Sequence, residues 1–155
     1  MTAPIGELIK QDDVLLDVDA ATREDLLSRA AAFIAARHGL SAPAVRDALT
    51  ARERLGSTAL GHGVALPHAR MQGLRKPVAA FLRTRAPIAY DAPDGRPVSQ
   101  FLVLLVPAEA REHHLELMGC AACQFADRDF RVRLKSAANS SAVADLFDYL
   151  PDAPA

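Results

Sequence analysis

His68 lies in the part of the sequence where residues able to do chemistry are most concentrated. It follows Pro67, which fixes its own φ angle and pushes Leu66 toward an extended backbone. Gly61 and Gly63 allow backbone conformations closed to other residues and the close approach of a partner. A neutral imidazole is a competent nucleophile near pH 7, because the reference pKa of histidine is about 6.5. The pattern is compatible with two interpretations of His68. It is either a nucleophile held by stiff backbone or a surface histidine after a turn.

A second histidine is positioned by helical periodicity. On a helical wheel, His114 falls inside the predicted apolar arc of a long helix and His113 falls at its edge. The arc is defined by Leu117, Met118, Ala121, Ala122 and Phe125. The start of a helix favours bound anions and disfavours an imidazolium. His114 is therefore either a neutral donor to a ligand oxygen or to the ring of His68, or a core histidine satisfied by a backbone carbonyl.

Two metal-binding arrangements compete with this interpretation. Cys120 and Cys123 have C-x-x-C spacing, and a pair of histidines precedes them. The helical wheel places both cysteines on the face away from His114, which favours two small residues on a packed helix. A hydrolytic zinc site formed by His62, His68 and His114 is a further alternative, but we identify no outer shell of carboxylates or histidines for it.

The glycine-rich segment 56–63 does not end in Lys-Ser or Lys-Thr, so it is not a nucleotide P-loop. No protein-kinase signature is present either. We therefore expect no ATP, no metal and no other cofactor.

Composition limits the class of protein. The chain has 155 residues, half of them hydrophobic, with 18 basic and 19 acidic side chains. This length fits one globular domain, and the near-neutral charge argues against a nucleic-acid clamp. No apolar run approaches the ~20 residues that span a bilayer, and the first residues lack a signal-peptide pattern. We expect a cytoplasmic protein without membrane insertion.

Periodicity and turn residues predict the elements that position these side chains. Thr22 and Ser41 are typical helix N-caps, Asp25 occupies the capping-box position after Thr22, and His38 is interpreted as a charge at a helix C-terminus. Continuous apolar runs bounded by turns indicate buried strands. The predicted strands are 14–18, 77–82 and 101–106, with loop and short strand over 55–68, and the predicted helices are 22–38, 41–56, 112–126, 129–137 and 141–150.

Helices before, between and after buried strands are typical of a layered α/β domain. We expect one such domain over 4–150, with a mixed β-sheet flanked by helices. The remaining residues, 151–155, are expected to fray.

The segment around His68 also resembles a known signature. Enzyme IIA proteins of the bacterial phosphoenolpyruvate phosphotransferase system, fructose–mannitol type (the EIIA type-2 domain), carry an acidic or amide residue followed at fixed spacing by an apolar-Ala-apolar-Pro-His-small run. The matching residues are Glu53, Leu60-Gly61 and Val64-Ala65-Leu66-Pro67-His68-Ala69. Gly-Ser-Thr before this run and His-Gly-Val-Ala within it look most like the nitrogen-regulatory branch. The resemblance covers nearly the whole chain, including 105–108 and His114-Leu115.

The resemblance implies roles for particular residues. His68 corresponds to the histidine that accepts a phosphoryl group from the phosphohistidine of an HPr-like carrier. Arg52 matches the family's phosphoryl-contacting arginine, and a planar guanidinium can hold phosphoryl oxygens in a bidentate clamp. His114 matches the second active-site histidine. Ser57 and Thr58 offer hydroxyls to the phosphoryl group or satisfy loop backbone, and backbone is favoured for Ser57.

The resemblance also implies partners. In the nitrogen-regulatory branch the protein regulates targets such as potassium-transport proteins and sensor kinases according to its phosphorylation state. The alternatives are a sugar-specific IIA that passes phosphate to a IIB component and a binding module that has lost transfer. The sequence leaves open the target, the phosphorylated ring nitrogen and the oligomeric state, a homodimer included.

Overall fold

The computed structural model describes residues 4–109 and 111–151 of the chain, with a six-stranded mixed sheet at the centre. The strands are β1 (Val14–Val18), β2 (Ala59–Gly61), β3 (Val64–Ala65), β4 (His68–Met71), β5 (Val78–Ile88) and β6 (Val98–Pro107). Their order is β1-β5-β6-β3-β2, and β4 also pairs with β6. Strands β1 and β5 are parallel, as are β3 and β4 to β6, whereas β5–β6 and β2–β3 are antiparallel.

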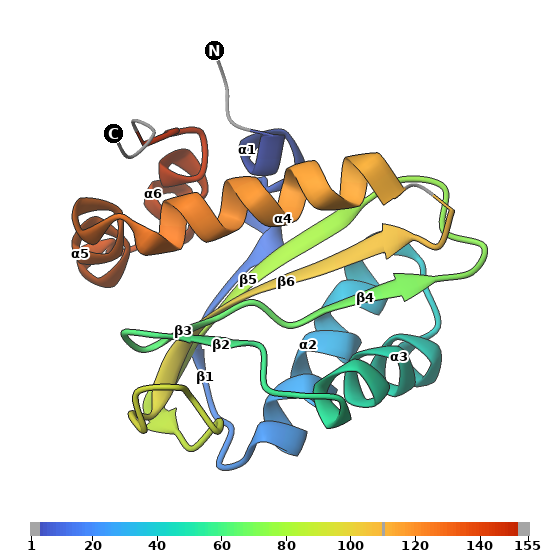
Figure 1. Ribbon diagram of the computed structural model, residues 1–155, viewed down its shortest axis with the longest axis horizontal. Helices are drawn as coiled ribbons and strands as arrows, with labels where there is room; N and C mark the ends of the chain where they lie inside the picture. The colour runs from blue at the N-terminus through green and yellow to red at the C-terminus, as the bar shows by residue number, and fades with distance from the viewer. Residues whose placement is uncertain (1–3, 110, 152–155) are drawn as a thin grey trace.

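Helices cover both faces of this sheet (Figure 1). They are α1 (Pro4–Leu8), α2 (Arg23–His38), α3 (Ala42–Arg54), α4 (Arg111–Ala126), α5 (Arg128–Ser136) and α6 (Ser140–Leu146), with a short 3-10 helix, η1 (Gln11–Asp13), before β1. One layer holds α2 and α3, and the other holds α1, α4, α5 and α6. None of the helices in the described ranges has both the length and the apolarity needed to cross a membrane. The arrangement confirms the predicted layered α/β domain.

Residues 101–106 of strand β6 form a continuous apolar run. Their side chains alternate between the two faces of the sheet, and helices cover each face here, so both sets are apolar. Leu102, Leu104 and Val106 pack into the core under α4, whereas Phe101, Val103 and Leu105 pack into the core over α2 and α3. Full burial of each such side chain stabilises the fold by roughly 1.5–3 kcal/mol.

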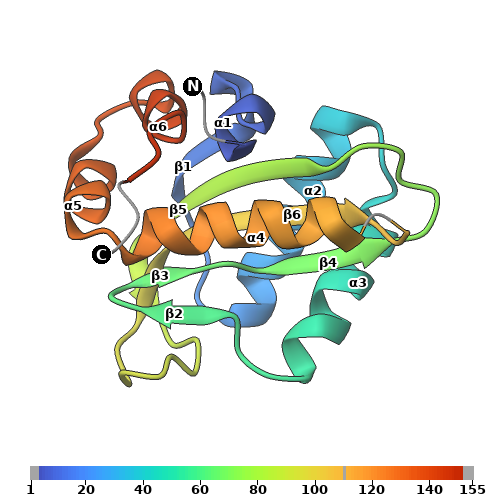
Figure 2. The ribbon, with the colours of Figure 1, turned by 45° about the horizontal axis from the view of Figure 1, so that its top comes forward.

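Strands β3 and β4 lie in one line along β6, with Leu66 and Pro67 between them (Figure 2). Pro67 has no N–H to give to a ladder, so the pairing is interrupted there. Its carbonyl still accepts a hydrogen bond of 2.9 Å from the N–H of Leu104, which keeps the two short strands in register. The interruption places His68 at the first residue of β4.

The helix starts agree with the sequence predictions, and several ends differ. Thr22 accepts a hydrogen bond from the Asp25 N–H, and Ser41 accepts one from the Ala44 N–H. Strand β5 runs to Ile88, beyond its predicted end, because its outer half pairs with the start of β6. Helix α6 ends at residue 146, and residues 152–155 of the predicted frayed tail lie outside the described residues.

The predicted apolar face of α4 is confirmed at Leu117, Ala121 and Phe125, which are buried, and is wrong at Ala122, which is exposed. Cys120 is buried as well, although the wheel put it on the face away from His114. The buried face turns toward Gln124, whose amide donates to the Phe147 and Tyr149 carbonyls. Helix α1 packs against α4, a contact that a wheel of one helix cannot include.

His38 also differs from its predicted role. It lies in the last turn of α2, which ends at Gly39 with φ 70°. Its ring does not serve the helix end, because Nε2 lies 2.9 Å from the Asp13 carboxylate. His38 therefore ties α2 to η1.

Candidate active site

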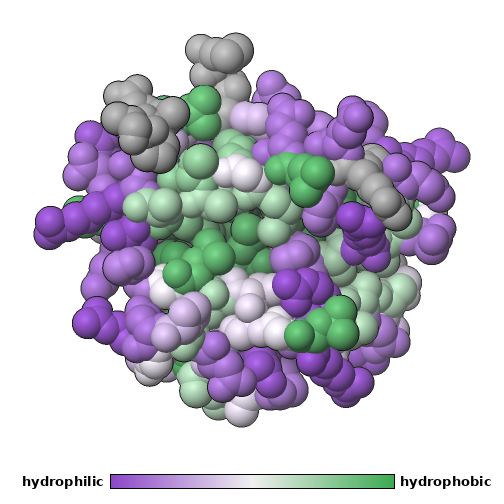
Figure 3. All heavy atoms as spheres, in the orientation of Figure 1, coloured by the Kyte–Doolittle hydropathy of each residue, from purple (hydrophilic) through white to green (hydrophobic). Residues whose placement is uncertain are grey.

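A pocket of about 420 Å³ opens beside β4, between the layer of α3 and the layer of α4. It is lined by Ala48, Ala51, Arg52, His68, Ala69, Arg70 and His114. Apolar side chains gather near the centre of this face and polar side chains surround them (Figure 3). The structure therefore brings together Arg52, His68 and His114, which are far apart in the sequence.

The ring of His68 is held by its own backbone segment. Its Nδ1 lies 2.8 Å from the Leu66 carbonyl oxygen. A carbonyl can only accept, so Nδ1 carries the proton of this hydrogen bond and Nε2 keeps its lone pair. Burial lowers the pKa of His68 and the Arg52 guanidinium lowers it further, against the opposing effects of the Leu66 hydrogen bond and the Glu53 carboxylate. The ring is therefore neutral and nucleophilic near neutral pH.

His114 lies in the first turn of α4 and faces His68. The centroids of the two imidazole rings are 5.9 Å apart, with their planes tilted by 56°. Burial lowers the pKa of His114, and the positive charge of Arg70 and the neighbouring His68 lower it further. A neutral His114 can donate one N–H into the pocket that it lines together with His68.

Two guanidinium groups contribute positive charge to the pocket. Arg52 lies in the last turn of α3, and its Nη1 donates to the Gly56 carbonyl oxygen at 2.9 Å. This bond orients the side chain and leaves the other N–H groups of the fork for a ligand. Arg70 follows His68 by two residues on β4, so both side chains point to the same face of the strand. An oxyanion between these groups meets positive charge on two sides.

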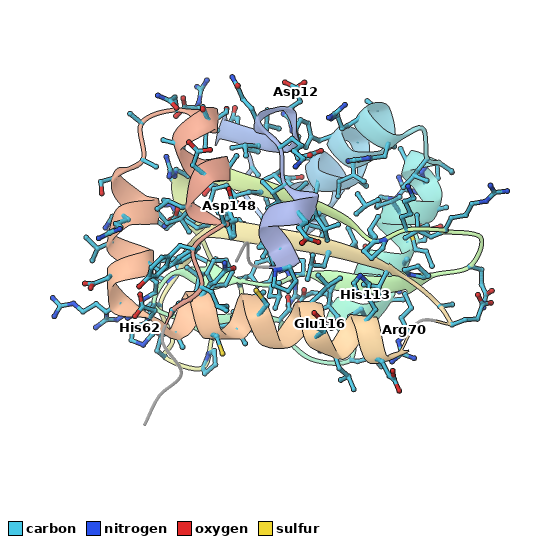
Figure 4. The ribbon with its side chains drawn as sticks, turned by 90° about the horizontal axis from the view of Figure 1, so that it is seen from above. Asp12, His62, Arg70, His113, Glu116 and Asp148 are labelled. Atoms are coloured by element: carbon cyan, nitrogen blue, oxygen red, sulfur yellow. The ribbon has the colours of Figure 1, made fainter. Side chains whose placement is uncertain are left out.

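Arg70 is the pocket residue for which the sequence analysis had no role. Figure 4 shows it near the N-terminal end of α4, close to His113. Its only sequence signal is the strand alternation of period two from His68, and that signal depends on knowing that β4 begins at the histidine. An exposed arginine without this context is most often a solvated charge.

Ser57 and Thr58 do not line the pocket. The Ser57 hydroxyl donates to the Tyr90 carbonyl oxygen at 2.6 Å. The buried Thr58 hydroxyl donates to Glu53 at 2.6 Å. Both hydroxyl protons are therefore used inside the fold, which argues against the expectation that they hold a phosphoryl group.

The remaining histidines and cysteines lie apart from the pocket's lining. His62 occupies the β2–β3 turn with φ 56°, and Figure 4 places it toward the opposite end of α4 from Arg70. His113 is exposed, 3.8 Å from Glu116. Cys120 is buried and Cys123 is exposed, and both are free thiols. Within 4–109 and 111–151, no three His, Cys, Asp or Glu residues are grouped so that they could hold a metal ion.

Comparison with known proteins identifies the family of this site. Residues 7–149 match the family model of the phosphoenolpyruvate-dependent sugar phosphotransferase system, EIIA 2. The chain belongs to the EIIA 2 family. This result confirms the resemblance drawn from the segment 53–69.

The relatives of this EIIA 2 domain include nitrogen regulatory proteins. It is 39% identical over 130 residues to a nitrogen regulatory protein of Pseudomonas aeruginosa, covering 83% of this chain and 84% of that protein. The crystal structure of nitrogen regulatory protein IIA-Ntr from Neisseria meningitidis matches it with a TM-score of 0.88 and 38% identity, over 92% of this chain and 98% of that one.

A more distant EIIA 2 neighbour shares the fold alone. Enzyme IIA mannitol of Escherichia coli, in a complex with phosphorylated enzyme IIB mannitol, matches with a TM-score of 0.72 and 18% identity, over 90% of this chain and 96% of that one. As an EIIA 2 domain, the chain is a phosphotransferase component, and its kind of partner is a phosphocarrier or a IIB protein.

Proposed function

We propose that this EIIA 2 domain accepts a phosphoryl group on Nε2 of His68 from the phosphohistidine of an HPr-like carrier and regulates target proteins according to its phosphorylation state. The single observation that carries the proposal is the Nδ1–Leu66 hydrogen bond, because it fixes the proton on one nitrogen and presents the other as nucleophile. The similarity to nitrogen regulatory proteins supports the regulatory branch over a sugar-specific IIA.

The transfer step needs no cofactor. The Nε2 lone pair forms the new P–N bond while the donor's P–N bond breaks, and the donor imidazole leaves with that electron pair. With its other nitrogen protonated, the donor leaves as a neutral ring. The proton of His68 stays on Nδ1, where it is hydrogen-bonded to the Leu66 carbonyl oxygen. Catalysis is then positioning and charge stabilisation, as in other phosphoryl transfers.

The pocket residues divide the stabilisation of the transferred group. The Arg52 fork binds phosphoryl oxygens in a bidentate manner, and Arg70 adds a second positive charge. His114 donates an N–H from the other helical layer and holds the group between the two rings. Since phosphorylation adds close to two negative charges here, it changes the surface that a partner meets.

Exposed leucines next to the pocket suit a transient carrier. Leu55, directly after α3, is 84% exposed, and Leu115, beside His114 on α4, is 69% exposed. Apolar side chains at the rim allow a modest docking area around a charged centre. The regulatory targets, of the potassium-transport or sensor-kinase type, meet the same face. The proposal includes a cytoplasmic location, because phosphoenolpyruvate supplies the phosphoryl group there.

The test is phosphorylation from phosphoenolpyruvate by enzyme I and the HPr-like carrier, followed by intact mass and acid lability. We expect one acid-labile phosphoryl group in the wild type and none in His68→Ala. His62→Ala is the matched control, since it removes an exposed histidine away from the pocket and leaves labelling intact. Wild-type protein that stays unlabelled beside working carriers, or labelled His68→Ala, contradicts the proposal. Onward transfer to a IIB protein would favour the sugar-specific branch.

A further inference from the structure

Glu53 is a buried carboxylate that the transfer step does not use. It is 4% exposed, and among the described residues it forms no ion pair. Its partners are neutral donors: the Thr58 N–H at 2.7 Å, the Thr58 hydroxyl at 2.6 Å and the Tyr90 hydroxyl at 2.9 Å. Burying a charge is costly unless it is well hydrogen-bonded, so three bonds on one carboxylate indicate a specific role.

From this carboxylate, hydrogen bonds lead step by step to the acceptor ring. Thr58 is fixed by Glu53 through both its N–H and its hydroxyl. The Thr58 carbonyl accepts from the Leu66 N–H at 3.0 Å. The Leu66 carbonyl in turn accepts from Nδ1 of His68 at 2.8 Å. Each link uses a different group of Thr58 or Leu66, so the position of the ring depends on the position of the carboxylate.

We propose that Glu53 is a positioning residue for the phosphoryl acceptor, acting on His68 through Thr58 and Leu66. This inference rests on the proposed function, because a fixed ring orientation matters for transfer only if His68 accepts the phosphoryl group. The second anchor of the carboxylate is Tyr90, from the segment between β5 and β6. The Ser57 hydroxyl donates to the Tyr90 carbonyl, which holds the loop after α3 against the same segment. Through these bonds the His68 ring is fixed relative to the segment between β5 and β6, not only to the loop after α3.

The charge of Glu53 acts on the same ring. Among the described side chains, the titratable and charged groups facing His68 are Arg52 and Glu53 of α3, Arg70 of β4 and His114 of α4. Among them Glu53 is the one carboxylate, and it opposes the lowering of the His68 pKa by burial and by Arg52. Positioning and charge can be separated by substitution, because glutamine keeps the hydrogen bonds and loses the charge. The Thr58 and Tyr90 hydroxyls then accept from its amide instead of donating.

The experiment records the ¹⁵N signals of His68 in the unphosphorylated protein, giving its tautomer and pKa, in the wild type, Glu53→Gln, Glu53→Ala and Tyr90→Phe. We expect Glu53→Gln to keep the Nδ1–H tautomer and to lower the His68 pKa. We expect folded Glu53→Ala to lose the single tautomer. Tyr90→Phe removes one of the three bonds to the same carboxylate and leaves the Thr58–Leu66–His68 links, so it should change the His68 signals less than Glu53→Ala does.

A kinetic measurement completes the test. Phosphoryl transfer to Glu53→Ala should be about tenfold or more slower at saturating carrier, with the half-saturating carrier concentration unchanged, because a misplaced nucleophile reduces the chemical step. Glu53→Gln should recover most of that rate. If Glu53→Ala does not fold, Glu53→Gln decides, because positioning through hydrogen bonds predicts that this variant keeps the single tautomer and most of the rate. Loss of the single tautomer in folded Glu53→Gln, or a wild-type rate in folded Glu53→Ala, overturns the proposal. If the His68 signals respond to the Glu53 substitutions as expected but no carrier phosphorylates the wild type, the result contradicts the proposed function and leaves the positioning role intact.

Discussion

Asp13 and Glu53 are both buried carboxylates, and they are satisfied in different ways. Asp13 is 1% exposed and lies 2.9 Å from Nε2 of His38 and 3.4 Å from Nε of Arg37. Glu53 is held by neutral donors alone. Asp13 also accepts a 3.0 Å hydrogen bond from the Lys10 N–H. Its side-chain partners lie at the end of α2 and join that helix to η1, whereas the partners of Glu53 lead to the pocket. The same chemical group therefore serves assembly in one region and the site in the other.

The largest expected difference between the two regions is in stability. Glu53→Ala leaves three donors of Thr58 and Tyr90 without their acceptor inside the fold and should cost about 3 kcal/mol or more. Asp13→Ala should cost about 1–2 kcal/mol, because the side chains of Arg37 and His38 are 40% and 27% exposed and can be hydrated again. Urea unfolding of both variants measures the difference. Equal losses in the free energy of unfolding would contradict the expected difference between neutral and charged partners.

The arginines near the two carboxylates should differ in their effect on phosphoryl transfer. Arg52→Lys should slow transfer about tenfold, because the lysine loses the bidentate fork while keeping the charge. Arg37→Lys keeps a cation beside Asp13, outside the pocket, and should leave the rate unchanged. Initial rates of transfer from the phosphorylated carrier test this. A wild-type rate for Arg52→Lys would exclude the clamp.

Acid should weaken the pocket in a defined range. The folded pKa values of His68 and His114 are lowered, so the unfolded chain binds protons first as the pH falls. Their contribution to stability is complete above the unfolded pKa of about 6.5 and is lost as the pH falls through the folded pKa values. Transfer needs a neutral His68, so its rate should be constant above that range and then fall about tenfold per pH unit below the folded pKa. Rates between pH 5 and 8 check this, with Asp13→Asn as a control that keeps the same profile.

Salt should give the smallest difference. The Asp13 ion pair with Arg37 is partly exposed, so added salt screens it. The stability difference between wild type and Asp13→Asn should shrink by a few tenths of a kcal/mol in 1 M salt. The corresponding difference for Glu53→Gln should stay the same, since Glu53 forms no ion pair among the residues that the structure describes. Thermal unfolding at low and high salt distinguishes the two, and parallel changes would contradict the comparison.

Much of the fold follows from local sequence rules. The N-caps Thr22 and Ser41 and the apolar runs of β5 and β6 depend on near neighbours, and they were predicted from sequence. The burial of Cys120 on α4 was not, because it depends on packing against α1, which lies more than a hundred residues earlier in the chain. The periodicity of a sequence predicts how wide the apolar face of a helix is. It does not predict which other helix will pack against that face.

The features of the site also differ in whether the sequence could predict them. The signature around His68, together with the resemblance, indicated which residues meet in the pocket. It could not show that Thr58 is turned inward, because the Glu53 carboxylate that binds it also needs the hydroxyl of Tyr90, 37 residues away. It also could not show Arg70, whose place depends on the first residue of β4. Residues whose partners are distant in sequence need the tertiary structure.

The placement of the pocket across both helical layers also concerns folding. Arg52 comes with the layer of α2 and α3, His68 with the sheet and His114 with the layer of α4. During synthesis, His68 is made well before α4, so the proposed acceptor exists before the group that completes its pocket. Local detachment of α4 likewise removes His114 from the pocket while leaving His68 in place. Under the proposed function, efficient phosphoryl transfer therefore requires that both layers have closed on the sheet, and fully assembled chains are phosphorylated fastest.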